Sequence, residues 1–339
     1  MNVDLDQRIA EVLAGSAAGA DALSLLRQAG LDHLPLPGEG QTIARWRALA
    51  AVAQFDLSLA KLYEGHTDAL AILEEIDQDG MAVPGGAWCV WAAESPGGRT
   101  CIERVADGEV RLTGAKHWCS GALTGDHALL TAWEEGVQAP QLVAIDLRQP
   151  GIQIDDTAWK AVGMAASMSV NVTFKGATGR LVGRPGEYLS RPGFWHGGAG
   201  IAACWYGGAT GIASSLKAAL LGTRPGEASA FRLAALGRVE LALEETAALL
   251  RQAAQWMDAN PLLDASSVAL SVRLSAEQCA RRVIDEVGKA LGAVPFCLDA
   301  KFAQAVADLP VFIRQSHADR DFAALGERAL QREAQAWTL

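Results

Sequence analysis

The chain has 339 residues, of which half are hydrophobic and a fifth are charged, a composition typical of a folded globular protein with a substantial core. Its formal net charge of −10 argues against a nucleic-acid partner, because phosphate binding needs a basic surface. The six cysteines show no CxxC spacing, so we expect neither a metal site nor a disulfide framework. No secretory signal and no apolar run of membrane-spanning length is visible, so we expect a soluble cytoplasmic protein.

Hydrophobic residues recur at helical spacing in the first part of the chain, which predicts an α-helical domain over residues 1–83. The expected helices are one around Ile9 to Leu13, one that ends at Gly30, one over residues 42–64 and one over residues 68–76. His66 falls between the last two of these and is expected to cap carbonyl groups at a helix end.

Short β-favouring runs and turns follow, which predicts a β-domain over residues 84–190. The expected segments are a strand from Trp88 into the Pro-Gly-Gly loop, a strand over Glu109 to Thr113, a tight turn over Gly114 to Lys116, an extended piece over His117 to Gly121, and strands over residues 127–133, 141–147 and 170–174. If the piece after Lys116 is extended, Trp118 and Ser120 share one face, because alternate residues of a strand point the same way. An indole beside a hydroxyl suits a flat, partly polar ring, although such a pair is also typical of ordinary packing.

The last part of the chain is helical and rich in alanine. Four long helices are expected over residues 194–221, 227–258, 266–291 and 299–331. The breaks between them are the segments GTRPGE, NPLLDASS and GAVPF, which are built from helix-breaking residues. Long helices joined by short loops indicate an up-and-down four-helix bundle over residues 191–339.

The segment Leu112 to Ala122 reads L-x-G-x-K-x-W-x-S-x-A and resembles a motif of the acyl-CoA dehydrogenase superfamily. Two further motifs, the strand with its Pro-Gly-Gly loop and the Gly-Met-x-x-Ser turn before Val170, follow the family's order. The resemblance implies an α+β fold with an N-terminal helical domain, a barrel-like β-domain and a C-terminal four-helix bundle. It also implies an FAD cofactor, with Trp118 against the isoalloxazine and Ser120 near its reactive ring nitrogen.

The resemblance implies further cofactor contacts. Backbone amides of the Pro-Gly-Gly loop at Gly97 would contact the flavin, although Ala93 occupies the position of the family's threonine. Arg224 corresponds to an arginine that binds the pyrophosphate. Gly292 keeps the first glycine of a turn that receives another part of the cofactor, and Ala293 replaces the next one. His66 lies where relatives often carry a polar residue that faces the substrate cavity.

The glutamate that removes the substrate α-proton in acyl-CoA dehydrogenases is missing. The positions that the resemblance assigns to it fall at about Ala323, Ala329 or Ile201. Arg314, His317 and Asp321 fall at i, i+3 and i+7, on one face of the expected last helix, and are the catalytic candidates. The alternative is a buried salt-bridge cluster that ties helices together.

The sequence therefore predicts an FAD-dependent oxidoreductase that acts on a non-standard acyl-CoA or acyl-like substrate. The first alternative is a flavin-dependent monooxygenase or oxidase of the same fold, with His317 as the proton-handling group. The second is a protein that binds a flavin or an acyl or carrier-linked ligand without turnover. The expected partners are a small-molecule substrate, an electron acceptor or flavin reductase, and further copies of the chain in a homodimer or homotetramer.

Overall fold

The computed structural model describes residues 4–15, 20–76, 84–106, 108–224, 226 and 228–331. The chain divides into two compact units, each assembled from separate segments. The helical unit comes from Met1–Gln7, Pro35–Leu57 and Trp195–Leu339, and the barrel unit comes from Arg8–Leu34 and Ser58–Phe194. The division into three consecutive domains that the sequence predicts stays a prediction.

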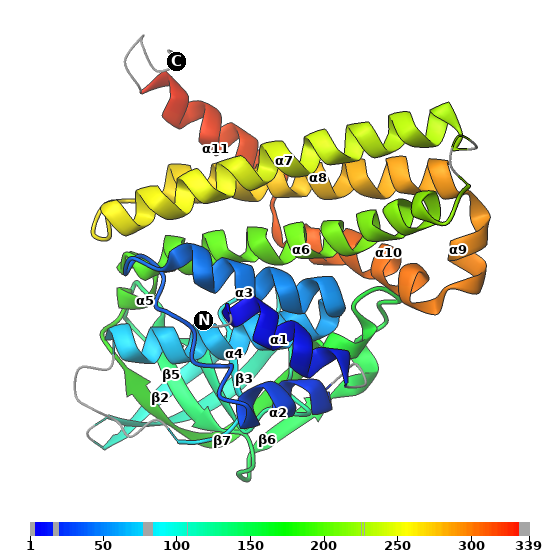
Figure 1. Ribbon diagram of the computed structural model, residues 1–339. Helices are drawn as coiled ribbons and strands as arrows, with labels where there is room; N and C mark the ends of the chain where they lie inside the picture. The colour runs from blue at the N-terminus through cyan, green and yellow to red at the C-terminus, as the bar shows by residue number, and fades with distance from the viewer. Residues whose placement is uncertain are drawn as a thin grey trace. The chain divides into compact units, whose positions relative to one another are not determined.

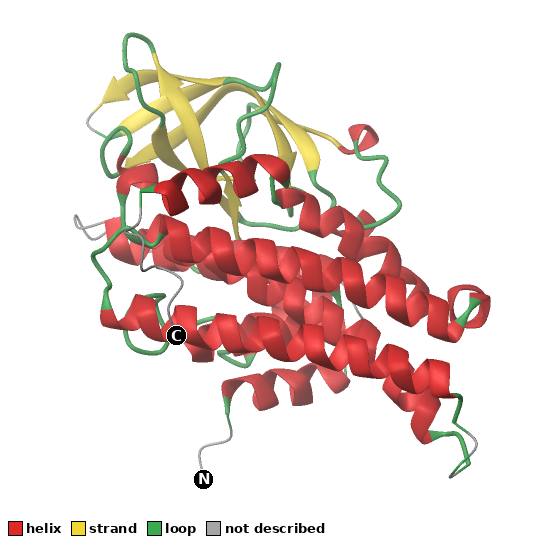
Figure 2. Cartoon of the chain, turned by 90° about the horizontal axis from the view of Figure 1, so that it is seen from above, coloured by secondary structure: helices red, strands yellow, loops and turns green. Residues whose placement is uncertain are grey.

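The barrel unit is built around a sheet that closes on itself. Its strands are β1 (Trp88–Trp91), β2 (Thr100–Ala106), β3 (Glu109–Cys119), β4 (His127–Glu134), β5 (Gln141–Asp146), β6 (Ile152–Asp155) and β7 (Val170–Val182). The order β4-β2-β3-β7-β5 is closed by pairing of β5 with β4, which makes a five-stranded barrel. Strand β1 pairs in parallel with β4, and β6 pairs antiparallel with β7. Figure 2 shows these strands as one curved sheet.

Both faces of strands β4 and β5 are buried, which explains why they read as nearly continuous hydrophobic runs. Leu130 and Val143 belong to the core enclosed by the barrel strands. Leu129 and Leu142, which alternate with them, pack with Ile72 on the opposite face. Ile72 lies on helix α4 (Leu57–Ile76), which thereby covers the outside of this part of the barrel. The expected strands over residues 127–133 and 141–147 are confirmed.

The N-terminal helices are α1 (Leu5–Ala14), α2 (Ala20–Gln28), α3 (Thr42–Phe55) and α4. The predicted helix break around His66 is wrong, because the chain leaves helical geometry at Asp56, whose backbone is extended. His66 lies inside α4 and is buried. Its Nδ1 accepts a hydrogen bond from the backbone N–H of Trp88 at 3.0 Å, and its Nε2 lies 3.1 Å from a carboxylate oxygen of Asp32. His66 therefore joins three segments of the barrel unit and does not cap a helix end.

The predicted turn over Gly114 to Lys116 is also wrong, because β3 runs through it without interruption. Gly114 pairs with Thr100 on one side and with Phe174 on the other. It has a positive φ of 108°, and a Cβ at this position would collide with the carbonyl oxygen of Arg99. The glycine therefore marks a close crossing of two backbones inside the sheet, which a sequence pattern does not distinguish from a turn.

We expect Gly114→Ala to lower the free energy of unfolding by about 3 kcal/mol, since the substitution combines backbone strain with a backbone collision. Gly136→Ala is the matched control, because Gly136 also has a positive φ, of 78°, but a Cβ there meets no atom within 4 Å. The control substitution should lower the free energy of unfolding by only about 1 kcal/mol. Urea denaturation monitored by circular dichroism would measure both, and equal losses would contradict the close crossing.

The helical unit contains α3 and the helices α6 (Gly193–Leu221), α7 (Ala230–Ala259), α8 (Ser266–Leu291), α9 (Ala293–Leu298), α10 (Ala300–Phe312) and α11 (Asp319–Leu330). The first two residues of α6, Gly193 and Phe194, belong to the barrel unit. The barrel unit also contains the short helix α5 (Glu187–Ser190). Helices α7 and α8 pack side by side (Figure 1). The first three expected long helices agree with α6, α7 and α8. Within the described part of the chain, no helix is long and apolar enough to cross a membrane.

The fourth expected helix, over residues 299–331, is wrong as a single helix. After α10 and a short 3₁₀ turn, the backbone of Ser316 is extended and that of Ala318 has a positive φ of 48°. The carboxylate of Asp321 accepts a hydrogen bond from the backbone N–H of His317 at 2.9 Å, which stabilises the start of α11. The side chain of Asp321 thus satisfies a backbone N–H that lies outside a helix, which favours two separate helices over one continuous helix.

Candidate functional site

Trp118 lies at a bulge of β3, where the pairing with β7 shifts between Lys116 and Cys119. Its φ of 57° is unusual for a large side chain and turns the indole outward, so that 56% of the residue is exposed. Lys116 and Cys119 are both buried. The expectation that Trp118 and Ser120 share the face of an extended segment is wrong, because the N–H of Ser120 turns back to the carbonyl of Trp118 at 3.0 Å. The bulge nevertheless brings an exposed indole beside a serine.

The side chain of Ser120 begins a chain of hydroxyl groups. Its Oγ lies 2.7 Å from the Oγ of Ser169, which lies 3.0 Å from the Oγ of Ser167. The hydroxyl of Ser167 donates to the carbonyl of Met164 at 2.8 Å. The carbonyl oxygen of Ser120 is held separately by the indole N–H of Trp91 at 3.0 Å. Both the backbone and the side chain of Ser120 are therefore fixed.

Sequence reasoning identified Ser120, included Ser167 only as the serine of the Gly-Met-x-x-Ser turn, and missed Ser169. The pairing of β3 with β7 brings them together, since Cys119 lies opposite Val170 in the sheet. The available signal was the alternation of two serines just before a hydrophobic strand. Ser167 ends a short 3₁₀ turn and Met168 has a positive φ of 40°, so the two serines do not lie on an extended segment, and their spacing alone does not predict the contact.

The Pro-Gly-Gly loop is attached to the same segment through His117. The Nδ1 of His117 lies 2.9 Å from the Oγ of Ser95, and a Cβ built on Gly98 would lie 3.0 Å from that nitrogen. Gly97 has a φ of 79°, and Ala93 is exposed at the start of the loop. The structure thus brings the predicted loop residues to the segment that carries Trp118, although sequence reasoning missed His117.

A buried lysine supports the loop from the inside of the sheet. Lys116 is only 1% exposed, and its Nζ donates to a carboxylate oxygen of Glu94 at 2.8 Å. The same Nζ donates to the hydroxyl of Thr131 at 2.8 Å and to its carbonyl at 3.0 Å. Burial alone would raise the pKa of Glu94, but the hydrogen bonds from Lys116 and Thr131 outweigh it and lower the pKa. Glu94 is therefore an anionic anchor for the loop.

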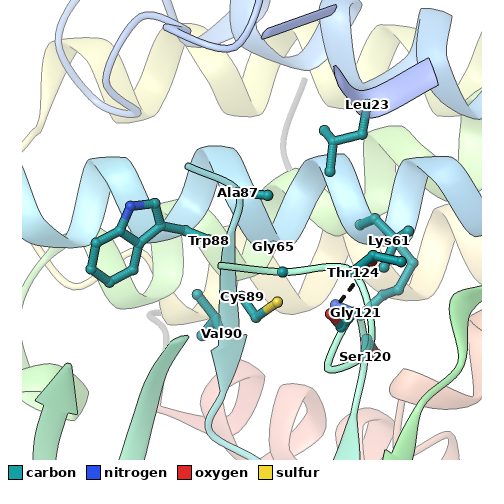
Figure 3. Close-up of a pocket in the computed structure, with 12 residues that line it drawn as sticks. Leu23, Lys61, Gly65, Ala87, Trp88, Cys89, Val90, Ser120, Gly121 and Thr124 are labelled. Carbon is teal, nitrogen blue, oxygen red and sulfur yellow. Dashed lines mark hydrogen bonds between the residues drawn. The ribbon is translucent and has the colours of Figure 1, made fainter. Parts of the chain in front are cut away.

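Ser120 is one of the residues that line a small cavity, as Figure 3 shows. Its volume of about 20 Å³ is enough for one water molecule and too small for a substrate. Gly121 and Gly125 close over the thiol of Cys89, and a Cβ on Gly125 would lie 2.7 Å from that sulfur. Burial raises the pKa of Cys89 to about 12, so its thiol is neutral at physiological pH and no nucleophile. The cavity belongs to the packing that holds the Ser120 loop.

The other two residues that were expected to contact the cofactor, Arg224 and Gly292, belong to the helical unit. Arg224 is exposed in the loop after α6. Gly292 has a φ of 67° and caps the C-terminus of α8. The expected open turn after Gly292 is wrong, since the next residues, from Ala293 to Leu298, form helix α9.

The three catalytic candidates do not share one helix face, so that expectation is wrong. His317 and Asp321 remain together, with Nδ1 and Oδ1 3.4 Å apart, and 58% of the histidine side chain is exposed. Arg314 instead donates to the buried carboxylate of Glu277 at 2.9 Å, and Arg281 donates to the same oxygen at 2.6 Å. Arg314 therefore belongs to an ion-pair cluster, as the alternative reading expected. The catalytic roles of the three residues stay predictions.

The residues around Trp118 fit the ring system of a flavin. An exposed indole offers a stacking surface, the neighbouring Ser120 offers a polar group, and the loop at Gly97 has no side chain that would block a close approach. The turn at Gly292, which was expected to receive another part of the cofactor, fits less well, since helix α9 occupies its place.

No protein-family model and no curated protein matches the sequence, whereas solved structures match the fold. Dibenzothiophene monooxygenase TdsC from Paenibacillus sp. A11-2, solved with FMN and indole, has a TM-score of 0.83 at 17% identity and covers 97% of this chain and 97% of its own. Methanesulfinate monooxygenase MsuC from Pseudomonas fluorescens has a TM-score of 0.78 at 19% identity, covering 97% of this chain and 95% of its own. Nitrososynthase from Micromonospora carbonacea var. africana has a TM-score of 0.77 at 18% identity and covers 96% of this chain and 94% of its own.

These similarities extend over nearly the whole length of each chain, and at such low identities they establish the fold alone. TdsC and MsuC are both monooxygenases, and TdsC has been solved with FMN bound. The mixture of helices with a closed barrel agrees with the fold class expected from the motifs. The resemblance of the motifs to the acyl-CoA dehydrogenase superfamily agrees with this finding, and this chain has the fold of the three solved structures.

Proposed function

We propose that the protein is a flavin-dependent oxidoreductase, and more specifically a monooxygenase, whose flavin ring stacks on Trp118 beside Ser120. The observation that carries the proposal is the bulge in β3, which exposes a large indole next to a fixed hydroxyl. An exposed tryptophan in a strained backbone conformation is poorly explained by packing alone. The fold shared with two monooxygenases supports the same class of reaction.

The missing glutamate supports a monooxygenase over an acyl-CoA dehydrogenase. The positions at Ala323, Ala329 and Ile201 carry no carboxylate that would remove an α-proton. A monooxygenase needs a group that handles a proton instead, and His317, whose Nδ1 lies 3.4 Å from a carboxylate oxygen of Asp321, is the candidate in the helical unit. An acyl-CoA or carrier-linked substrate is therefore the less favoured alternative.

We infer that the cofactor is FMN, although FAD was the expectation from the motifs. FMN is smaller than FAD, and the turn at Gly292 that was expected to receive another part of FAD is replaced from Ala293 onward by helix α9. The TdsC structure contains FMN, which supports this choice. The bound flavin would supply the activation of oxygen. Trp118 and Ser120, both in the barrel unit, would hold its ring, and the phosphate-binding role of Arg224 stays a prediction.

Visible absorption of the purified protein after incubation with FMN or FAD, followed by gel filtration, tests the cofactor. We expect flavin bands in about one-to-one ratio with the chain after incubation with FMN, and weaker retention of FAD. Oxygen uptake with a flavin reductase and NADH would support the monooxygenase, whereas anaerobic bleaching by an acyl-CoA would support the dehydrogenase. A colourless protein with either flavin would contradict both. The same gel filtration tests the proposed homodimer or homotetramer.

A further inference from the structure

The hydroxyl chain from Ser120 to Met164 has a definite direction, because each serine hydroxyl carries one proton. The carbonyl of Met164 can only accept, and it receives the proton of Ser167 at 2.8 Å. Ser167 then has no proton left for Ser169, so Ser169 must donate to Ser167 across their 3.0 Å contact. Ser169 in turn has none left for Ser120, so Ser120 must donate to Ser169 at 2.7 Å.

The opposite direction would leave one contact without a proton. If Ser169 donated to Ser120, the oxygens of Ser169 and Ser167 would face each other with lone pairs at 3.0 Å. Ser167 is only 1% exposed, so water does not readily compensate for that lost hydrogen bond. The directed arrangement makes all three hydrogen bonds and is therefore the more stable one.

We propose that Ser169 and Ser167 are positioning residues that turn the proton of Ser120 inward and leave its lone pairs for a ligand. Ser120 is then an acceptor for an N–H group of a ring that stacks on Trp118. This inference rests on the proposed function, because the ring is taken to be a flavin. A reduced flavin carries a ring N–H at N5, where the oxidised form has only an acceptor nitrogen. The site should therefore bind reduced flavin more tightly than oxidised flavin.

The backbone around Ser120 supports this role, because it holds the serine in place independently of the side chain. The carbonyl of Ser120 accepts from the indole of Trp91 at 3.0 Å, and the N–H of Gly121 donates to the carbonyl of Ser167 at 3.2 Å. Loss of the Ser169 hydroxyl should thus free the Ser120 proton without moving the serine itself. The proton could then point to the ligand and favour the oxidised ring.

The test compares the dissociation constants of oxidised FMN and, under anaerobic conditions, of reduced FMN for the full chain. Ser169→Ala and Ser167→Ala should each shift the ratio of the two constants toward oxidised FMN by about fivefold to tenfold. Ser169→Thr keeps the hydroxyl and should restore the wild-type ratio. Ser190→Ala is the matched control, since its exposed hydroxyl contacts the carbonyl of Glu187, away from the chain of serines and from the Pro-Gly-Gly loop, and should leave the ratio unchanged. The midpoint potential of the bound flavin gives the same ratio independently.

The outcomes separate this inference from the proposed function. If the wild-type protein binds neither form of FMN, the proposed function fails and the inference fails with it. If the wild type binds FMN and Ser120→Ala changes the ratio while Ser169→Ala and Ser167→Ala do not, the positioning role is overturned and the flavin site stands. Should Ser169→Ala not fold, Ser167→Ala decides the question, because it interrupts the same chain one hydroxyl further away.

Discussion

Lys116→Met should lower the free energy of unfolding by about 3 kcal/mol, one of the largest effects we expect from a single substitution. The lysine is buried, and its ammonium group satisfies Glu94 together with the hydroxyl and the carbonyl of Thr131. Methionine fills a similar volume but removes the hydrogen bonds to the carbonyl and hydroxyl of Thr131 and leaves the carboxylate of Glu94 without its counterion. Guanidinium denaturation monitored by tryptophan fluorescence would measure the loss.

The matched control is Arg104→Met, which removes another ion pair of the same barrel. Arg104 is half exposed and contacts Glu134 at 2.6 Å, so water replaces its interactions and the loss should stay below about 1 kcal/mol. A loss at Lys116 as small as that at Arg104 would show that the buried network contributes little to folding. Lys116→Met should also weaken FMN binding, because the Glu94 anchor of the loop is lost.

The lowered pKa of Glu94 gives this network a pH dependence. A carboxyl group whose pKa is lower in the folded state contributes stability above its unfolded pKa, and that contribution is lost as the pH falls through the folded value. The free energy of unfolding of the wild type should therefore decrease as the pH falls below the ordinary range of glutamate pKa values. That of the Glu94→Gln variant should decrease less steeply. Identical slopes for the two proteins between pH 5 and 3, measured by urea denaturation, would contradict this role.

Trp118→Ala should weaken FMN binding by about tenfold to a hundredfold, because stacking on an aromatic side chain contributes about 1–3 kcal/mol. Trp118→Phe keeps a stacking surface and should retain most of the affinity. Both variants should change the free energy of unfolding by less than about 0.5 kcal/mol, since most of the indole is exposed. Quenching of flavin fluorescence on titration with protein gives the dissociation constants.

Val105→Ala is the control for the loss of an exposed apolar side chain, because Val105 lies on β2 and is 52% exposed. It should leave FMN binding unchanged. Wild-type affinity in Trp118→Ala would place the flavin elsewhere and contradict the proposed site. Reduced affinity in both variants would point to a general effect on the barrel.

Local patterns in the sequence determined the broad fold. Short β-favouring runs predicted β4 and β5, and the alternation of Val170, Val172 and Phe174 predicted the start of β7. Alanine-rich segments between helix-breaking residues predicted α6, α7 and α8. The ordered motifs indicated the acyl-CoA dehydrogenase fold, and they directed attention to Trp118 and Ser120. These features depend on residues close together in the chain, which is why the sequence alone was sufficient.

The tertiary structure decided the features that depend on partners distant in the sequence. Gly114 reads as a turn until the carbonyl of Arg99 is seen beside it. Trp118 is exposed because the pairing of β3 with β7 shifts there, and Ser120 has a directed hydroxyl because that pairing brings Ser169 to it. Strand register and hydrogen-bond direction arise from contacts between separate segments, and no local period encodes them.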